Sequence, residues 1–137
     1  MHHQRRSIPY LAEQTKPSAL LTWNIVAQAQ AAYYAVTGLW PLIHMPSFLK
    51  VTGPKTDLWL VKTVGVLITV IGAALAVASR QPSARPETKL LGVGSAVGLT
   101  AIDVIYVAKG RIAPIYLLDA VAELGLIAWW IVAGRQR

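Results

Sequence analysis

The chain has 137 residues, of which 55% are hydrophobic and 14% are charged, and its formal net charge is +7. A soluble core of this length cannot bury so much apolar surface, so the composition excludes an ordinary soluble domain and indicates a protein embedded in a lipid bilayer. The positive charge does not indicate nucleic-acid binding, because the basic residues are spread over tails and loops and are not gathered on one face.

Four segments are long enough to cross a membrane. A spanning helix needs about 20 mainly apolar residues, and residues 19–43, 58–79, 90–108 and 112–133 meet that length. Pro41 and Pro46, a polar run at 81–86 and the turn at 109–111 separate them. The last turn is so short that the third and fourth segments must be antiparallel neighbours. We therefore predict an all-α polytopic membrane protein, an antiparallel bundle of four transmembrane helices.

The distribution of basic residues predicts the orientation of this bundle. Both tails and the second loop carry more of them than the opposite side, which places both termini in the cytoplasm. The chain is expected to be a multi-pass protein of the bacterial inner membrane, with a cytoplasmic or interfacial arm at residues 1–18 and a basic tail at 135–137. The basic residues on the cytoplasmic side are Arg5, Arg6, Lys16, Arg80, Arg85, Lys89, Arg135 and Arg137, and those on the outer side are Lys50, Lys55, Lys109 and Arg111.

Two residue types that usually hold cofactors are scarce. The chain has no cysteine, and His44 is its only histidine outside the first three residues. This excludes disulfides, iron–sulfur clusters, covalently attached haem and a haem held by two histidines of this chain, and it argues against a metal site. A cofactor bound by this chain alone would be an organic molecule such as a quinone or a lipid.

Three of the six acidic residues, Asp103, Asp119 and Glu123, fall inside the predicted spans. An unpaired carboxylate is costly there and usually functional. In the predicted topology Asp103 and Asp119 lie at the same depth below the outer surface, and Glu123 lies one turn deeper on the same face as Asp119. Lys62 enters from the same side on the second span, and its flexible stem is long enough to reach this layer.

Other polar and aromatic residues are predicted to join these acids. Tyr106 and Tyr116 share helix faces with Asp103 and Asp119, Gln28 lies near the depth of Glu123, and Trp59 lies beside the outer mouth. We expect a pocket open to the outer side that binds or transports a cation, a proton or a small amphiphile. The alternative is a structural network in which Lys62 and the acids lock the bundle together.

Glycine pairs mark two smooth helix faces. Gly94 and Gly98 form a G-x-x-x-G motif, and Gly65 and Gly72 lie seven residues apart on the second span. Such faces let two helix backbones approach closely, either within one bundle or between protomers. They are compatible with a homo-oligomer or with docking onto a larger membrane complex. The first outer loop, residues 44–55, is expected to contain a short interfacial segment and a tight turn that either caps the pocket or anchors the loop.

The stretch from Phe48 to Gly65, which includes VTGPKTDLWLVKTVG, resembles small bacterial four-helix membrane proteins of the broad DoxX-like type, as do the four spans with short loops. The resemblance implies a four-helix fold and a quinone-linked or accessory membrane role, and it assigns no functional residue. Three classes of function remain open. They are a binding or transport protein, an accessory subunit of a larger complex, and a membrane enzyme that uses the carboxyls for acid–base chemistry on a lipid-soluble substrate.

Overall fold

The computed structural model describes residues 22–135, which form five α-helices and no strand. This confirms the predicted all-α class. The predicted arm at 1–18 and the last two residues of the predicted tail lie outside the described residues. The helices are α1 (Trp23–Ile43), α2 (Met45–Thr52), α3 (Leu58–Ala78), α4 (Pro86–Ala108) and α5 (Tyr116–Arg135).

Three of these helices, α3, α4 and α5, are long and apolar enough to cross a membrane. Many of their large apolar side chains face outward, as in Leu67 and Val121, which are 58% and 66% exposed. Outward apolar side chains on helices of this length are what a lipid environment requires, so the structure indicates a membrane protein. Helix α1 has 21 residues, but its glutamines and tyrosines make it less apolar than the other three long helices.

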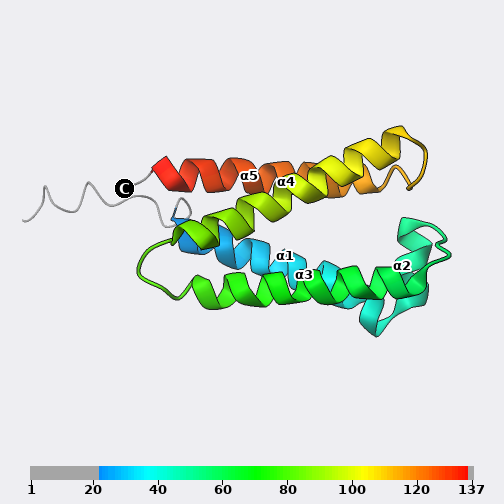
Figure 1. Cartoon of the computed structure of the whole chain (residues 1–137), viewed down its shortest axis with the longest axis horizontal. Helices are drawn as coiled ribbons and strands as arrows, with labels where there is room; N and C mark the ends of the chain where they lie inside the picture. The colour runs from blue at the N-terminus through cyan, green and yellow to red at the C-terminus, as the bar shows by residue number, and fades with distance from the viewer. Residues whose placement is uncertain (1–21, 136–137) are drawn as a thin grey trace, which may run out of the picture.

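The helices form two layers, each made of a closely packed pair (Figure 1). Helix α1 packs against α3, and α4 packs against α5, while the contacts between the two layers are fewer. The close packing of α4 on α5 agrees with the predicted pairing of the last two spans. Helix α2 lies at one end of the bundle, and the loop 79–85 lies at the other (Figure 1).

Glycines allow the close approach of α1 and α3. A Cβ atom added to Gly38 would lie 2.7 Å from the carbonyl oxygen of Gly65, and one added to Gly65 would lie 2.6 Å from that of Gly38. Farther along α3, a Cβ atom on Gly72 would lie 3.0 Å from the carbonyl oxygen of Ala31. The smooth face of Gly65 and Gly72 is therefore used within the chain.

The G-x-x-x-G face of α4 is arranged differently. A Cβ atom on Gly98 would have no neighbour within 4 Å, and one on Gly94 would only reach Leu90 of the same helix at 3.8 Å. Both glycines are exposed. This face therefore contacts no other helix among the described residues and is open to lipid or to another chain.

Prolines shift the beginnings of two helices from the predicted bounds. Helix α4 begins at Pro86, four residues before the predicted span, because the fixed φ of proline and its missing N–H suit the first helical position. Helix α5 begins only at Tyr116, since residues 109–115, with Pro114 among them, form the preceding turn. Within the predicted loop 44–55, residues 45–52 form the eight-residue helix α2, which is followed by Gly53 with φ of 90°.

The interior of the bundle is apolar toward one end and polar toward the other. Apolar side chains from the start of α1 and the ends of α3 and α5 form one cluster, which includes Val26, Leu75 and Leu126. This cluster lies toward the loop 79–85. Toward α2, the interior between the layers is instead occupied by carboxyl and phenol groups, as described next.

Candidate functional site

The three predicted intramembrane acids converge in the half of the bundle nearer α2. Asp103 of α4 and Glu123 of α5 are only 4% and 1% exposed, and Asp119 in the first turn of α5 is half-buried. Asp119 interacts electrostatically with both Asp103 and Glu123. No ion pair joins any of the three to a basic side chain among residues 22–135. Within the described part of the chain, the site is thus a cluster of acids without an ion-pair partner.

Two consecutive tyrosines of α1 donate hydrogen bonds to this cluster. The Tyr33 hydroxyl donates to Oδ1 of Asp119, and the Tyr34 hydroxyl donates to Oε2 of Glu123 at 3.0 Å. Their ring centroids lie 6.2 Å apart with an interplanar angle of 47°, so the two hydroxyls reach carboxyls one helical turn apart on α5. These bonds connect the α1–α3 layer to the α4–α5 layer.

Asp103 completes the cluster without a donor of its own. Its Oδ2 atom is buried and has no hydrogen-bond partner among the described residues, and its carboxyl interacts electrostatically with those of Asp119 and Glu123. Ionised carboxylates only accept hydrogen bonds, so two carboxyls can bond to one another only when one of them is protonated. A proton on Asp103 or on Asp119 would allow such a bond between them.

A second polar contact between the layers lies between the acids and the apolar cluster. The Gln30 amide donates from Nε2 to the carbonyl oxygen of Gly92 at 2.8 Å and accepts at Oε1 from the Trp130 indole at 2.7 Å. The Trp130 ring lies directly on Gly92, where an added Cβ atom would come within 2.7 Å of it. Gln30 thus joins α1 to both α4 and α5 on the side of the site that faces the apolar core.

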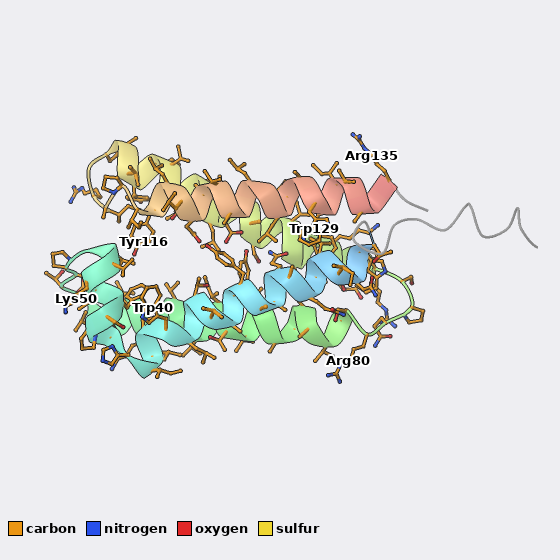
Figure 2. All side chains as sticks on the ribbon, turned by 180° about the vertical axis from the view of Figure 1, so that it is seen from behind. Trp40, Lys50, Arg80, Tyr116, Trp129 and Arg135 are labelled. Atoms are coloured by element: carbon orange, nitrogen blue, oxygen red, sulfur yellow. The ribbon has the colours of Figure 1, made fainter. Side chains whose placement is uncertain are left out.

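The opposite side of the site is covered by α2 and the turn that follows it. Lys55 donates to the carbonyl oxygens of Thr52 and Gly53, and its Nζ atom lies 5.6 Å and 5.1 Å from the ring centroids of Phe48 and Tyr116. Since Tyr116 is the first residue of α5, Lys55 joins this turn to the other layer. Figure 2 shows Tyr116 at this end of the molecule, with Lys50 and Trp40 across from it at the same end. This contact of Lys55 with Tyr116 forms a cap at the α2 end of the bundle, while the closing of a pocket by this loop stays a prediction.

Lys62 and Tyr106 are not brought to the acids. Lys62 is exposed on α3, and because α3 packs mainly on α1, it does not pair with Asp103 or Asp119. Tyr106 is 39% exposed, and its ring lies under Lys109 at 5.6 Å. The Lys–Asp pair expected from the sequence is not formed.

Gln28, Trp59 and Tyr116 also differ from their expected places. Gln28 is exposed, and the buried amide of α1 is that of Gln30, two residues later and nearly on the opposite face. Trp59 is 67% exposed on the outer surface of α3. Tyr116 contacts Lys55 and makes no hydrogen bond to a carboxyl among the described residues. It belongs to the cap and not to the acid cluster.

Sequence reasoning missed Tyr33, Tyr34 and Trp130. A signal for the tyrosines was present, since they follow Gln30 by three and four residues and so share its helix face. Trp130 lies near the end of α5, where tryptophans commonly mark the membrane interface, but it is 4% exposed and packs in the core. Its position near a helix end does not distinguish the two roles.

Two hollows of the described surface are lined by residues other than the acids, one between α3 and α4 and one on the outer face of α1. Among residues 22–135, no group of three His, Asp or Glu side chains is placed to hold a metal ion. Comparison with protein-family models, curated proteins and solved structures finds no match to this chain. The DoxX-like resemblance stays a prediction.

Proposed function

We propose that this protein is a four-span protein of the bacterial inner membrane, with both termini in the cytoplasm, whose buried carboxyl cluster binds a proton and exchanges it with the side of α2. One observation carries this proposal. Asp103, Asp119 and Glu123 share the interior of the bundle, and no basic side chain among the described residues pairs with them.

The cost of burying charge supports proton binding. Moving an ionised carboxylate out of water costs several kcal/mol, by order of magnitude, unless a counter-charge or hydrogen bonds compensate for it. The hydroxyls of Tyr33 and Tyr34 supply one donor each to Asp119 and Glu123, and Asp103 receives none from a tyrosine. A proton taken up between Asp103 and Asp119 removes one negative charge and supplies the missing donor.

A proton fits the geometry better than the other ligands considered for this site. A metal ion needs several oxygen ligands converging on one point, and the described residues offer no such group of three. A quinone or another amphiphile needs a cavity, and the two hollows described above are lined by residues other than the acids. A proton requires neither.

The gradient of burial supports exchange with the side of α2. Asp119 is half-buried and lies in the first turn of α5, whereas Glu123 is 1% exposed one turn farther in. Toward the loop 79–85, the interior is closed by Gln30, Trp130 and the apolar cluster. A proton arriving from the α2 end therefore meets Asp119 first, and the cap formed by Lys55 on Tyr116 lies at its entry.

Infrared difference spectroscopy of the protein in a bilayer tests the binding of the proton. Between alkaline and acidic pH, a C=O band of a buried protonated carboxyl should appear, and Asp103→Asn should remove it. Glu87→Gln is the matched control, because Glu87 is exposed in the first turn of α4 and carries the same charge. The control should leave the buried band unchanged.

The result also separates function from a purely structural role. If Asp103→Asn folds normally and the difference spectrum keeps every buried carboxyl band, the proposed site is wrong. If a band is present and lost as expected, proteoliposomes with an internal pH dye will show whether the bound proton crosses the bilayer. A flux that Asp119→Asn abolishes would make the protein a transporter, and its absence would leave a proton-binding protein.

The open G-x-x-x-G face favours a second candidate function, an accessory subunit or homo-oligomer that docks through α4. Gly94 and Gly98 lie on the exposed side of this helix, and no other described helix covers them. Gly94→Leu should disrupt association if this face is an interface, and Gly125→Leu, at an exposed glycine of α5 with no neighbour within 4 Å, is the control. Native purification from the membrane, followed by mass spectrometry, would identify a stoichiometric partner. An oligomeric state unchanged by Gly94→Leu would count against this candidate.

A further inference from the structure

A hollow on the lipid-facing surface lies at the end of the bundle opposite to the acid cluster. It has a volume of about 570 Å³ and is open along one side. Its walls come from the second half of α3, the loop 79–85 and the first turn of α4. The lining residues are Val70, Ala73, Ala74, Val77, Ala78, Gln81, Arg85, Glu87 and Thr88.

The packing of the helices explains why this hollow exists. Helix α3 is held by α1 and α4 is held by α5, so α3 and α4 make few contacts and diverge from the short loop that connects them (Figure 1). The small side chains of the alanines at positions 73, 74 and 78 leave space on the surface of α3 that faces α4. The groove is therefore a consequence of the fold and does not depend on the conformation of one side chain.

The two ends of the groove differ in polarity. One end consists of aliphatic side chains from Val70 to Ala78, which at 1.5 Å per residue extend over about 12 Å of helix. One leaflet of the hydrocarbon core is about 15 Å thick. The other end carries the amide of Gln81, the guanidinium of Arg85 and the hydroxyl of Thr88. An apolar channel of nearly one leaflet with a polar head matches an amphiphile lying along the bilayer normal.

The basic residues at the polar end favour a negatively charged head group. Arg80 and Lys89 are exposed on either side of the groove, and Arg85 lines it. The only acid at this end among the described residues is Glu87, whose Oε1 lies 3.9 Å from Nη1 of Arg85, with both side chains about two-thirds exposed. Such an exposed pair is worth little, and a guanidinium binds a phosphate with paired donors.

We infer that the groove between α3 and α4 is a binding site for an anionic phospholipid, with one acyl chain along Val70–Ala78 and the phosphate at Arg85. This site is independent of the proton site, which lies in the interior and closer to α2. The N-terminal arm fits the groove less well, because it carries Arg5, Arg6 and Lys16 and would be repelled by the basic residues at the polar end. A neutral lipid would fill the apolar part of the groove without an ionic contact to these basic residues.

Two substitutions and their controls test the two halves of this site. In nanodiscs of phosphatidylcholine with a minor fraction of phosphatidylglycerol, the protein is extracted and its retained lipids are counted by native mass spectrometry. Arg85→Gln should lower retention of phosphatidylglycerol about fivefold, because one basic contact is worth about 1 kcal/mol. Ala74→Leu should also lower it, because the larger side chain fills the groove. Lys109→Gln and Ala128→Leu make the same changes at exposed positions away from the groove and should have no effect.

Cross-linking identifies what occupies the groove. A phosphatidylglycerol with a photoreactive acyl chain should attach to the peptide that contains Val70–Ala78. Equal retention of phosphatidylglycerol and phosphatidylcholine would overturn the proposal, as would equal losses in Arg85→Gln and Lys109→Gln. It would also be overturned if a photoreactive residue placed at position 77 cross-linked to the N-terminal arm or to a second copy of the chain.

Discussion

The Tyr34 hydroxyl donates a hydrogen bond of 3.0 Å to Oε2 of Glu123, and the two side chains come from helices of different layers. Both residues are almost completely buried, with exposed fractions of 0% and 1%. At its other end, Tyr34 packs against α3, where a Cβ atom on Gly72 would lie 3.2 Å from the Tyr34 Cβ. One side chain therefore connects the α1–α3 contact to the acid cluster.

Tyr34→Phe should destabilise the protein while keeping the fold. The ring remains in place, but a buried carboxyl loses its donor, and hydrogen bonds to charged groups contribute about 1.5–3 kcal/mol. Unfolding in mixed micelles, followed by circular dichroism, measures the free energy. Tyr106→Phe is the control, because Tyr106 is partly exposed and donates no hydrogen bond to a carboxyl among the described residues. Equal stabilities of the two variants would contradict the importance of the bond to Glu123.

Gly38→Ala should weaken the packing of α1 on α3. The new methyl group would lie 2.7 Å from the carbonyl oxygen of Gly65 and 2.9 Å from the backbone nitrogen of Thr69, and backbone atoms cannot move aside without separating the helices. Overpacking of this kind costs about 1–3 kcal/mol. Thermal unfolding in detergent would report the loss.

Gly98→Ala makes the same chemical change where nothing lies within 4 Å. Because alanine is the better helix former, this variant should be as stable as the parent or more stable by about 0.5–1 kcal/mol. If the two alanine variants had the same melting temperature, α1 and α3 would not be in the contact described above.

The sequence predicted the helical class, the approximate bounds of the long helices and the burial of Asp103 and Glu123. These follow from local properties, namely apolar length, turn residues and the 3.6-residue period. It predicted the pairing of α4 with α5, which a short turn connects, but not the pairing of α3 with α1. Gly65 and Gly72 bring α3 against α1, so Lys62 on α3 does not meet the acids of α4 and α5. The choice between neighbours depends on the fit of whole surfaces, which no single segment contains.

The same limit explains the misplaced polar residues of α1. Gln28 and Gln30 lie nearly on opposite faces, and the sequence alone does not say which face points inward. The structure turns Gln30 inward, because its amide meets the carbonyl oxygen of Gly92 and the indole of Trp130. Because Tyr34 follows Gln30 by four residues, the same orientation of α1 places Tyr34 in the interior, with Tyr33 beside it.

Single-cysteine labelling should show the proposed topology, and the absence of cysteine from the parent makes every label specific. Ser83→Cys, in the loop between α3 and α4, should be protected from a membrane-impermeant maleimide in intact cells and should react after lysis. Arg111→Cys, in the loop between α4 and α5, should react in intact cells. Both positions are exposed, so failure to react reflects the membrane and not the fold. The reverse pattern would place the termini outside.

A double-mutant cycle on Gln30 and Trp130 should show that this contact joins the layers as a unit. Trp130→Phe leaves the Gln30 Oε1 without its donor, and Gln30→Leu leaves the indole N–H without its acceptor. Each single variant should lose about 1–3 kcal/mol, because each leaves a buried polar group unpaired. The double variant should lose less than the sum, since replacing both partners by apolar groups leaves neither unpaired. Additive losses would mean that the two side chains act independently and that their contact does not join the layers.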